Sequence, residues 1–303
     1  MISYVKIINY IGLEIIMELE FPERSGFAIF NMTGLGPEKS EIQITEMSTA
    51  NGGVFTSARL PSRNIVMSLR YWKWLDKTVE FVRHESYKYF PIMKPITLII
   101  QTENRRGVIK GYVEANSPVI FSKETHAQLS IICPDPFFYS EDIMVTTFDA
   151  VEPMFEFPFS NESLTEPLLI MGEIWPEAYR SVYYEGDAEI GVTIHIIATG
   201  PVTKFKIFDP ENERSMSIND DRLIALTGAG IGEGDHIVIS TVKGDKRITL
   251  TRGPNTYNIL NALNRDAFLF QLHKGDNLFA YSAEFGLEAI IFRIENRVAY
   301  EGV

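Results

Sequence analysis

The stretch Ile131-Ile132-Cys133-Pro134-Asp135-Pro136-Phe137-Phe138 divides the chain into two parts. Apolar residues alternate with polar ones from Gln128 onward and predict a strand that ends at Cys133. The prolines then stop this strand, because proline lacks the N–H group that a central strand donates. We therefore place a domain boundary near Tyr139 and expect two domains, at residues 1–139 and 140–303.

The residues before this boundary predict short strands and one helix. Apolar residues recur at every second position in several segments, as they do in half-buried strands. Leu75, Val79, Val82 and Tyr89 fall on one stripe of a helix over residues 75–89, and Pro91 closes it. The predicted strands cover residues 4–8, 14–19, 27–31, 41–45, 54–60, 64–72, 96–102, 108–114 and 128–133.

Residues 140–303 predict an antiparallel β-sandwich or jelly roll, because short strands recur at regular spacing between turn-forming residues. Ile190, Val192 and Ile194 share one face of a strand, so His195 faces the other way. Residues 258–263 predict one turn of helix. The predicted strands cover residues 188–198, 202–208, 223–226, 236–240, 247–251, 277–281 and 288–294.

The sequence lacks the local motifs of nucleotide, metal and acyl chemistry. The cluster Gly228-Ala229-Gly230-Ile231-Gly232-Glu233-Gly234-Asp235 has no third glycine for a GxGxxG motif and predicts a turn. Asn219-Asp220-Asp221 offers oxygen ligands for calcium without EF-hand spacing, so an Asx-rich turn is the favoured interpretation. None of the five histidines belongs to an HExxH motif, and no GxSxG occurs. We therefore predict no catalytic, cofactor-binding or metal-binding residues.

The composition suits a folded protein whose main function is not to bind nucleic acid. The formal net charge of −12 disfavours a surface that follows a phosphate backbone. Cys133 is the single cysteine, so an internal disulfide is excluded, and a buried apolar thiol is favoured over a reactive one. The first residues do not predict a signal peptide, and no apolar run reaches the ~18 to 20 residues of a membrane helix.

Three stretches of residues 1–139 resemble the distal tail (Dit) family of long-tailed bacteriophages. The string from Ile131 to Phe138 is the most specific, because this family often has a similar sequence at its domain junction. The Gly275-Asp276-Asn277 turn is a weaker similarity. The three stretches are residues 4–9 with 33–37, residues 62–66 with the predicted helix, and residues 111–114 with 121–122 and 131–138.

The resemblance implies a mainly β structural protein, not an enzyme, at the tail tip of a virion and made in the host cytoplasm. Such proteins form a ring, usually a hexamer, through an N-terminal β-sandwich with one helix and an extended hairpin arm. The ring joins the tail tube protein to a tail-associated protein, and the C-terminal galectin-like sandwich carries receptor-binding proteins in some phages. Residues 41–60 are the candidate arm, with Ile42, Ile44, Asn51, Gly52, Gly53, Val54 and Phe55 as its candidate contacts.

A carbohydrate-binding module in residues 140–303 is the main alternative function. Sugar sites combine aromatic faces with nearby polar side chains. Trp175, Tyr179, Tyr183 and Tyr184 are the candidate residues for such a platform, directed at the host cell wall, but core or surface packing is the favoured interpretation of these side chains. A tail hydrolase is disfavoured, because the catalytic signatures are missing.

Overall fold

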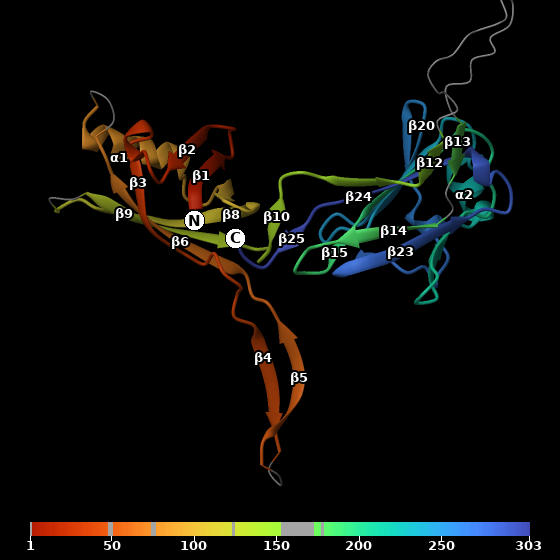
Figure 1. The fold of residues 1–303 in the computed structure, drawn as a ribbon, viewed down its shortest axis with the longest axis horizontal. Coiled ribbons are helices and arrows are strands. Elements are labelled where there is room, and N and C mark those ends of the chain that lie inside the picture. The colour runs from red at the N-terminus through yellow and green to blue at the C-terminus, as the bar shows by residue number, and fades with distance from the viewer. Residues whose placement is uncertain (1, 48–50, 74–76, 123–124, 153–172, 177–178) are drawn as a thin grey trace, which may run out of the picture. The chain divides into compact units, whose positions relative to one another are not determined.

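The computed structural model describes residues 2–47, 51–73, 77–122, 125–152, 173–176 and 179–303. Contacts within the chain divide it into two compact units (Figure 1). Unit 1 comprises Met1–Glu141 with Ala299–Val303, and unit 2 comprises Asp142–Val298. The second predicted domain, residues 140–303, includes Ala299–Val303, which the structure places in unit 1.

Unit 1 is a curled antiparallel sheet with one helix. Its strands are β1 (Ile2–Asn9), β2 (Glu14–Glu18), β3 (Phe27–Thr33), β4 (Glu41–Glu46), β5 (Gly53–Arg59), β6 (Arg63–Tyr71), β7 (Pro95–Thr102), β8 (Arg106–Val119), β9 (His126–Cys133), β10 (Phe138–Ser140) and β25 (Ala299–Tyr300). Seven of them follow the order β2-β1-β7-β8-β9-β6-β3. The two edge strands, β2 and β3, contact each other, so the sheet wraps around its own core.

The core of unit 1 follows from the alternation of apolar residues. Ile65, Met67 and Leu69 on β6 are buried, whereas the residues between them are less buried or exposed. Ile131 on β9 lies directly opposite Ile65 and is also buried. Each fully buried side chain of this size contributes about 1.5–3 kcal/mol. The strands predicted at residues 64–72 and 128–133 are therefore confirmed, with their apolar faces inward.

Helix α1 (Val79–Tyr89) begins later than predicted. Thr78 has an extended backbone and caps the helix by accepting a hydrogen bond from the Phe81 N–H, at 3.3 Å. The predicted start at residue 75 is therefore wrong, and Leu75 itself lies outside the described residues. The helix buries Val82 and Ser86 and packs against β1 and β6.

Unit 2 contains two larger antiparallel sheets. One has the order β11-β24-β16-β19-β20-β21 and the other β14-β23-β17-β18. Their strands are β11 (Met144–Thr147), β14 (Tyr179–Tyr184), β16 (Thr193–Ala198), β17 (Lys206–Asp209), β18 (Arg214–Ser217), β19 (His236–Ser240), β20 (Arg247–Arg252), β21 (Asn255–Asn258), β23 (Gly275–Ser282) and β24 (Ile290–Asn296). Two short pairs join β12 (Asp149–Glu152) to β13 (Glu173–Pro176) and β15 (Ile190–Gly191) to β22 (Gln271–Leu272).

Aromatic side chains join the two larger sheets of unit 2 into a sandwich. Tyr281 on β23 stacks on Phe292 of β24, with ring centroids 4.9 Å apart. Phe148 meets Phe292 edge to face at 4.7 Å, and Phe205 packs beside both Tyr281 and Phe292. All four rings are buried. Such ring pairs add about 0.5–1.5 kcal/mol beyond the burial of their area.

The strand predicted at residues 223–226 is wrong, because these residues belong to helix α2 (Asp220–Thr227). Asn219 caps the helix by accepting a hydrogen bond from the Arg222 N–H at 3.0 Å, and Gly228 ends it in the left-handed conformation. The residues considered for calcium therefore begin a helix. The predicted helical turn at residues 258–263 contains a 3-10 helix, Leu260–Ala262. Of the helices described, none is long and apolar enough to cross a membrane.

Candidate functional site

The hairpin of β4 and β5 extends away from the curled sheet of unit 1 (Figure 1). Its strands pair with each other and with no other described strand. Every residue of both strands is exposed. An isolated two-stranded hairpin is marginally stable in water. This segment is therefore available for pairing or packing with another chain.

The hairpin has one apolar and one polar face. Ile44 lies opposite Phe55, and Ile42 lies opposite Ala58, on the same face two residues away. The opposite face is polar: the Thr45 and Thr56 hydroxyls are 3.0 Å apart, Ser57 donates to Gln43, and Arg59 pairs with Glu41 at 2.7 Å. The hairpin is therefore an amphipathic ribbon whose apolar side faces solvent.

The structure brings three of the predicted arm residues together on that apolar face. Ile42, Ile44 and Phe55 are 57%, 61% and 63% exposed. Val54 is 49% exposed but lies opposite Thr45, on the other face, because the register shifts between Gln43 and Ile44.

The remaining predicted arm residues form the turn of the hairpin. Asn51 and Gly52 lie before β5, and Gly52 has a φ of 92°, which favours glycine. Gly53 lies so close to Ile44 that a Cβ at position 53 would be 2.3 Å from the Ile44 methyl group. These three residues shape the hairpin and contribute little apolar surface to it.

Arg63, which the sequence did not single out, is the centre of a buried polar cluster in unit 1. Its side chain is 1% exposed. Its guanidinium donates to the backbone oxygens of Pro136 at 2.6 Å, Gly34 at 2.6 Å, Gly36 at 2.7 Å and Glu301 at 2.7 Å. Burial lowers the pKa of Arg63 from its ordinary value. The guanidinium also lies over the Phe138 ring, 4.7 Å from its centroid.

The Arg63 cluster joins the segments that carry the sequence resemblance. Gly34 and Gly36 belong to the first stretch, Arg63 to the second, and Pro136 and Phe138 to the third. Arg63 is 73 residues from Pro136 and 238 residues from Glu301 along the chain. No local pattern marks an arginine whose partners are distant carbonyl groups, so this contact could not be predicted.

Residues 299–303 complete unit 1 beside Arg63. β25 pairs with β10, with Tyr300 opposite Phe138. The Val303 N–H donates to the Leu35 oxygen at 3.1 Å. Val303 also packs against Gly107 so closely that a Cβ at position 107 would come within 2.3 Å of its side chain. The last residues of the sequence are therefore an integral part of unit 1.

The predicted aromatic platform is not a single cluster. Tyr184 is buried, and its hydroxyl donates to the Ala188 oxygen at 2.8 Å. Tyr179 and Tyr183 are 65% and 71% exposed on the outer face of β14. Trp175 belongs to β13, but its side chain lies outside the described residues. Of the predicted platform residues whose side chains are described, Tyr179 and Tyr183 are accessible to a ligand and Tyr184 is not.

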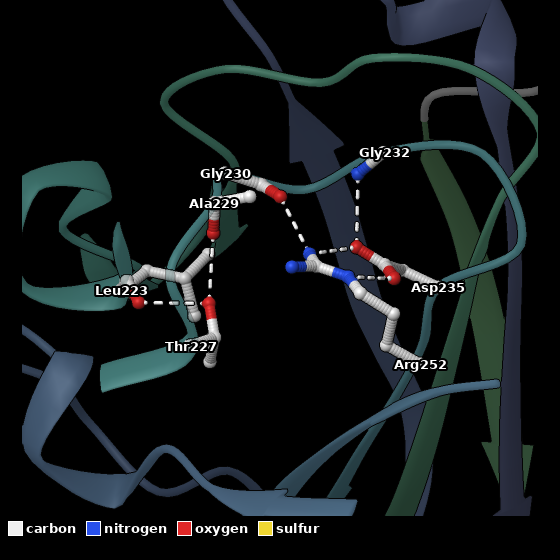
Figure 2. A network of polar contacts seen from close by, with 7 residues as sticks. All are labelled: Leu223, Thr227, Ala229, Gly230, Gly232, Asp235 and Arg252. Carbon is white, nitrogen blue, oxygen red and sulfur yellow. Dashed lines mark hydrogen bonds and ion pairs between the residues drawn. The ribbon is translucent and has the colours of Figure 1, made fainter. Parts of the chain in front are cut away.

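The glycine cluster of residues 228–235 is a turn held by an ion pair (Figure 2). Asp235, 1% exposed, accepts hydrogen bonds from the Arg252 Nε at 2.7 Å and from the Gly232 N–H at 2.9 Å. Burial raises the pKa of Asp235, but these hydrogen bonds outweigh it and leave that pKa below its ordinary value. Arg252 also donates to the Gly230 oxygen at 2.6 Å. These contacts support the predicted turn.

Two histidines stack on the outer face of the six-stranded sheet of unit 2. His195 Nδ1 lies 3.0 Å from His236 Nε2, and His195 Nε2 lies 3.4 Å from Glu295. The predicted orientation of His195, away from the core side chain of Ile194, is confirmed. Burial lowers the pKa of both imidazoles, and Arg293 adds to this effect.

Comparison with known structures finds the same fold in a phage protein. No family model matches the sequence, and no curated protein matches it. The protein has the mainly β fold of a solved phage hub component. That structure is the SPP1 Dit protein, described as a paradigm of the hub adsorption apparatus in phages that infect Gram-positive bacteria. The TM-score is 0.67 at 14% sequence identity, over 97% of this chain and 98% of that one.

Two baseplate structures of phage P2, in its activated conformation, are also similar. The calcium-containing structure gives a TM-score of 0.48 at 14% identity, over 98% of both chains. The strontium-containing structure gives 0.45 at 14% identity, over 97% of both chains. The resemblance inferred from the sequence is thus confirmed at the level of the fold by the SPP1 Dit protein.

Proposed function

We propose that this protein is a structural hub at the distal end of a long non-contractile phage tail. In this role it forms a ring that joins the tail tube to the tail tip or baseplate and its receptor-binding apparatus. The fold shared with the SPP1 Dit protein supports the role of a hub. We call the β4–β5 hairpin the arm. Its exposed apolar face is the observation that supports the proposal of a ring.

The arm suits contacts between copies of the chain. A closed ring needs head-to-tail interfaces, in which one patch of a subunit meets a different patch of the next. Full burial of an Ile or Phe side chain contributes about 1.5–3 kcal/mol. Ile42, Ile44 and Phe55 are each more than half exposed in the single chain, so most of this stabilisation remains available for a neighbour.

The proposed partners follow from the same role. The protein assembles with itself as a homohexamer, with the tail tube protein, with a tail-associated protein and with receptor-binding proteins. It acts as a structural component of the virion tail tip, not as an enzyme, after synthesis in the host cytoplasm. A net charge of −12 suits a ring around passing DNA, because like charges do not hold the phosphate backbone.

A matched pair of arm variants tests the ring. Ile44→Glu places a charge on the apolar face, and Thr45→Glu places the same charge one residue away on the polar face. Both positions are exposed, so neither variant should unfold the single chain. We expect Ile44→Glu to yield monomers and Thr45→Glu to yield rings, measured by particle mass and negative-stain microscopy.

Circular dichroism melts of both variants provide the control for folding. Equal assembly of the two variants would refute the role of the apolar face. A parent chain that stays monomeric at high concentration, both alone and with its tail tube protein, would refute the ring itself.

A further inference from the structure

An exposed apolar patch lies at one end of unit 1, where the turn between β1 and β2 meets the loop between α1 and β7. The Asn9 side chain joins the two segments, because it donates to the Lys88 oxygen at 2.8 Å and accepts from the Ile11 N–H at 3.1 Å. The Lys94 ammonium lies over the Tyr10 ring, 5.5 Å from its centroid. We call Lys94 and four exposed apolar residues the end patch; the four are Tyr10, Ile11, Ile92 and Met93, which are 53%, 68%, 53% and 82% exposed.

Met93 has a backbone conformation that bulky residues rarely adopt. Its φ is 64°, in the left-handed region that favours glycine. Hydrogen bonds fix this turn to β8, because the Met93 N–H donates to the Val113 oxygen at 2.9 Å and the Val113 N–H donates to the Lys94 oxygen at 3.4 Å. Strained residues that the surrounding structure holds in place are concentrated at functional sites. Here the strain presents a methionine, whose flexible side chain adapts to the shape of a partner.

The arm carries a charge opposite to that of the end patch. Glu46 shares the face of Ile42 and Ile44, because every second residue of β4 points the same way. It lies opposite Gly53, where this face reaches the turn of the hairpin. Among the residues that the structure describes, neither Glu46 nor Lys94 forms an ion pair, so each charge remains available to a partner. Both surfaces thus combine apolar side chains with one available charge, and the two charges have opposite signs.

The arm and the end patch lie at the same end of the curled sheet. Asn64, which follows the arm, lies opposite Ile132 on β9, and Ile132 lies opposite Tyr112 on β8. Tyr112 in turn lies opposite Pro95, the residue after Lys94. A ring whose axis runs along these strands keeps both surfaces at one level, so that rotation brings the arm of one copy to the end patch of the next.

We propose that the end patch of one copy receives the apolar face of the arm of the next copy. This inference rests on the proposed ring and names the surface that the arm meets. The three apolar side chains of the arm pack on the end patch, and Glu46 pairs with Lys94. The contact is head-to-tail, as a closed ring requires, because the arm and the end patch are different surfaces of one chain. A basic partner surface is disfavoured, because Lys94 would repel it.

Matched variants test the end patch by particle mass. Met93→Glu places a charge in the end patch, and Phe121→Glu places the same charge on a fully exposed apolar residue of the loop between β8 and β9. We expect Met93→Glu to yield monomers and Phe121→Glu to yield rings. Both side chains are exposed, so circular dichroism melts of the two variants should match that of the parent.

A mixture of two variants identifies the partner of the end patch. Ile44→Glu chains keep the end patch and lose the apolar face of the arm, whereas Met93→Glu chains keep the arm and lose the end patch. An intact arm from a Met93→Glu chain can therefore occupy the intact patch of an Ile44→Glu chain, but the resulting pair cannot be extended. We expect each variant alone to be a monomer and the mixture to yield a heterodimer and no ring.

Three results would overturn the end patch as the site of the arm and leave the ring itself standing. They are normal rings from Met93→Glu, equal loss of the ring in Phe121→Glu, and a mixture of the Met93→Glu and Ile44→Glu monomers that gives no heterodimer. Rings of Met93→Glu that fail to bind the tail tube protein would assign the patch to that protein instead. A parent chain that forms no ring, alone or with its tail tube protein, would remove the proposed ring and this contact with it.

Discussion

At the scale of single residues, Arg63 donates to four backbone carbonyl groups from three segments that are far apart in the sequence. A buried carbonyl oxygen that loses its hydrogen-bond donor costs about 1–3 kcal/mol. Arg63 gathers the 34–36 loop, the Pro-Asp-Pro corner and Glu301 around one guanidinium. Loss of this side chain should therefore loosen all three segments together.

We predict that Arg63→Ala destabilises unit 1 by about 3–5 kcal/mol, because more than one of these carbonyl groups loses its donor. Arg63→Lys should cost less, because lysine keeps the charge and some N–H donors, although it lacks the planar guanidinium. Cys133 provides the readout. It is buried, and burial raises the pKa of its thiol to about 12, so a thiol reagent should react with it only when unit 1 opens. Unchanged labelling of Cys133 in Arg63→Ala, relative to the parent, would contradict the prediction.

The stacked histidines predict a loss of stability in acid. Both folded-state pKa values lie below the ordinary 6.5, because burial and Arg293 oppose the charged form while Glu295 favours it. As the pH falls through 6.5, the unfolded chain therefore takes up protons before the folded chain does, and unfolding becomes easier. Urea melts at decreasing pH should show this loss. His236→Gln should reduce it, and an unchanged pH dependence in that variant would count against the pair.

At the scale of elements, alternation predicted the strands more reliably than it predicted their ends and partners. It identified β6, β9 and β16 because one face of each is buried and the other is not. It failed at residues 223–226, where a short apolar run suits either a strand or a helix. There the N-cap at Asn219 and the C-cap at Gly228 favour a helix over a strand.

The candidate site was predictable to a similar extent. The turn at Asn51, Gly52 and Gly53 marked the hairpin, and alternation marked Ile42 and Ile44 as neighbours on one face. Val54 and Phe55 are consecutive in a strand and point to opposite faces, so the sequence already excludes that both lie on the face of Ile44. The register shift beside Ile44 decides that Phe55 lies on that face, and the sequence contains no signal for such a shift.

The arm predicts a deletion that separates folding from assembly. None of its strand residues is buried, so replacing residues 41–59 with a short Gly-Ser linker should leave the melting temperature of the chain nearly unchanged. The same deletion should abolish the ring, because the apolar face is lost. Melting curves and particle mass measured on one preparation check both expectations. A large drop in melting temperature would instead assign the arm to the core of its own subunit.

At the scale of the whole molecule, the chain leaves unit 1 after Glu141 and returns to it at Ala299. Unit 1 therefore depends on contacts between residues far apart in the sequence, such as Phe138 with Tyr300 and Leu35 with Val303. Contacts of this kind form late in folding, because the loop between them must first be closed. Unit 2 lies between the two parts of unit 1 in the sequence and contains none of these contacts.

Removal of residues 299–303 should accordingly damage unit 1 and spare unit 2. The truncated chain loses the β10–β25 pairing, the Glu301 carbonyl that Arg63 binds and the Val303 packing on Gly107. We expect Cys133 to become reactive toward a thiol reagent while the near-ultraviolet signal of the Phe148, Tyr281 and Phe292 cluster persists. Glu301→Ala is the matched control: Arg63 binds the backbone oxygen of residue 301, so this variant should protect Cys133 as the parent does. Equal protection of Cys133 in the truncated chain would mean that residues 2–141 hold unit 1 together by themselves.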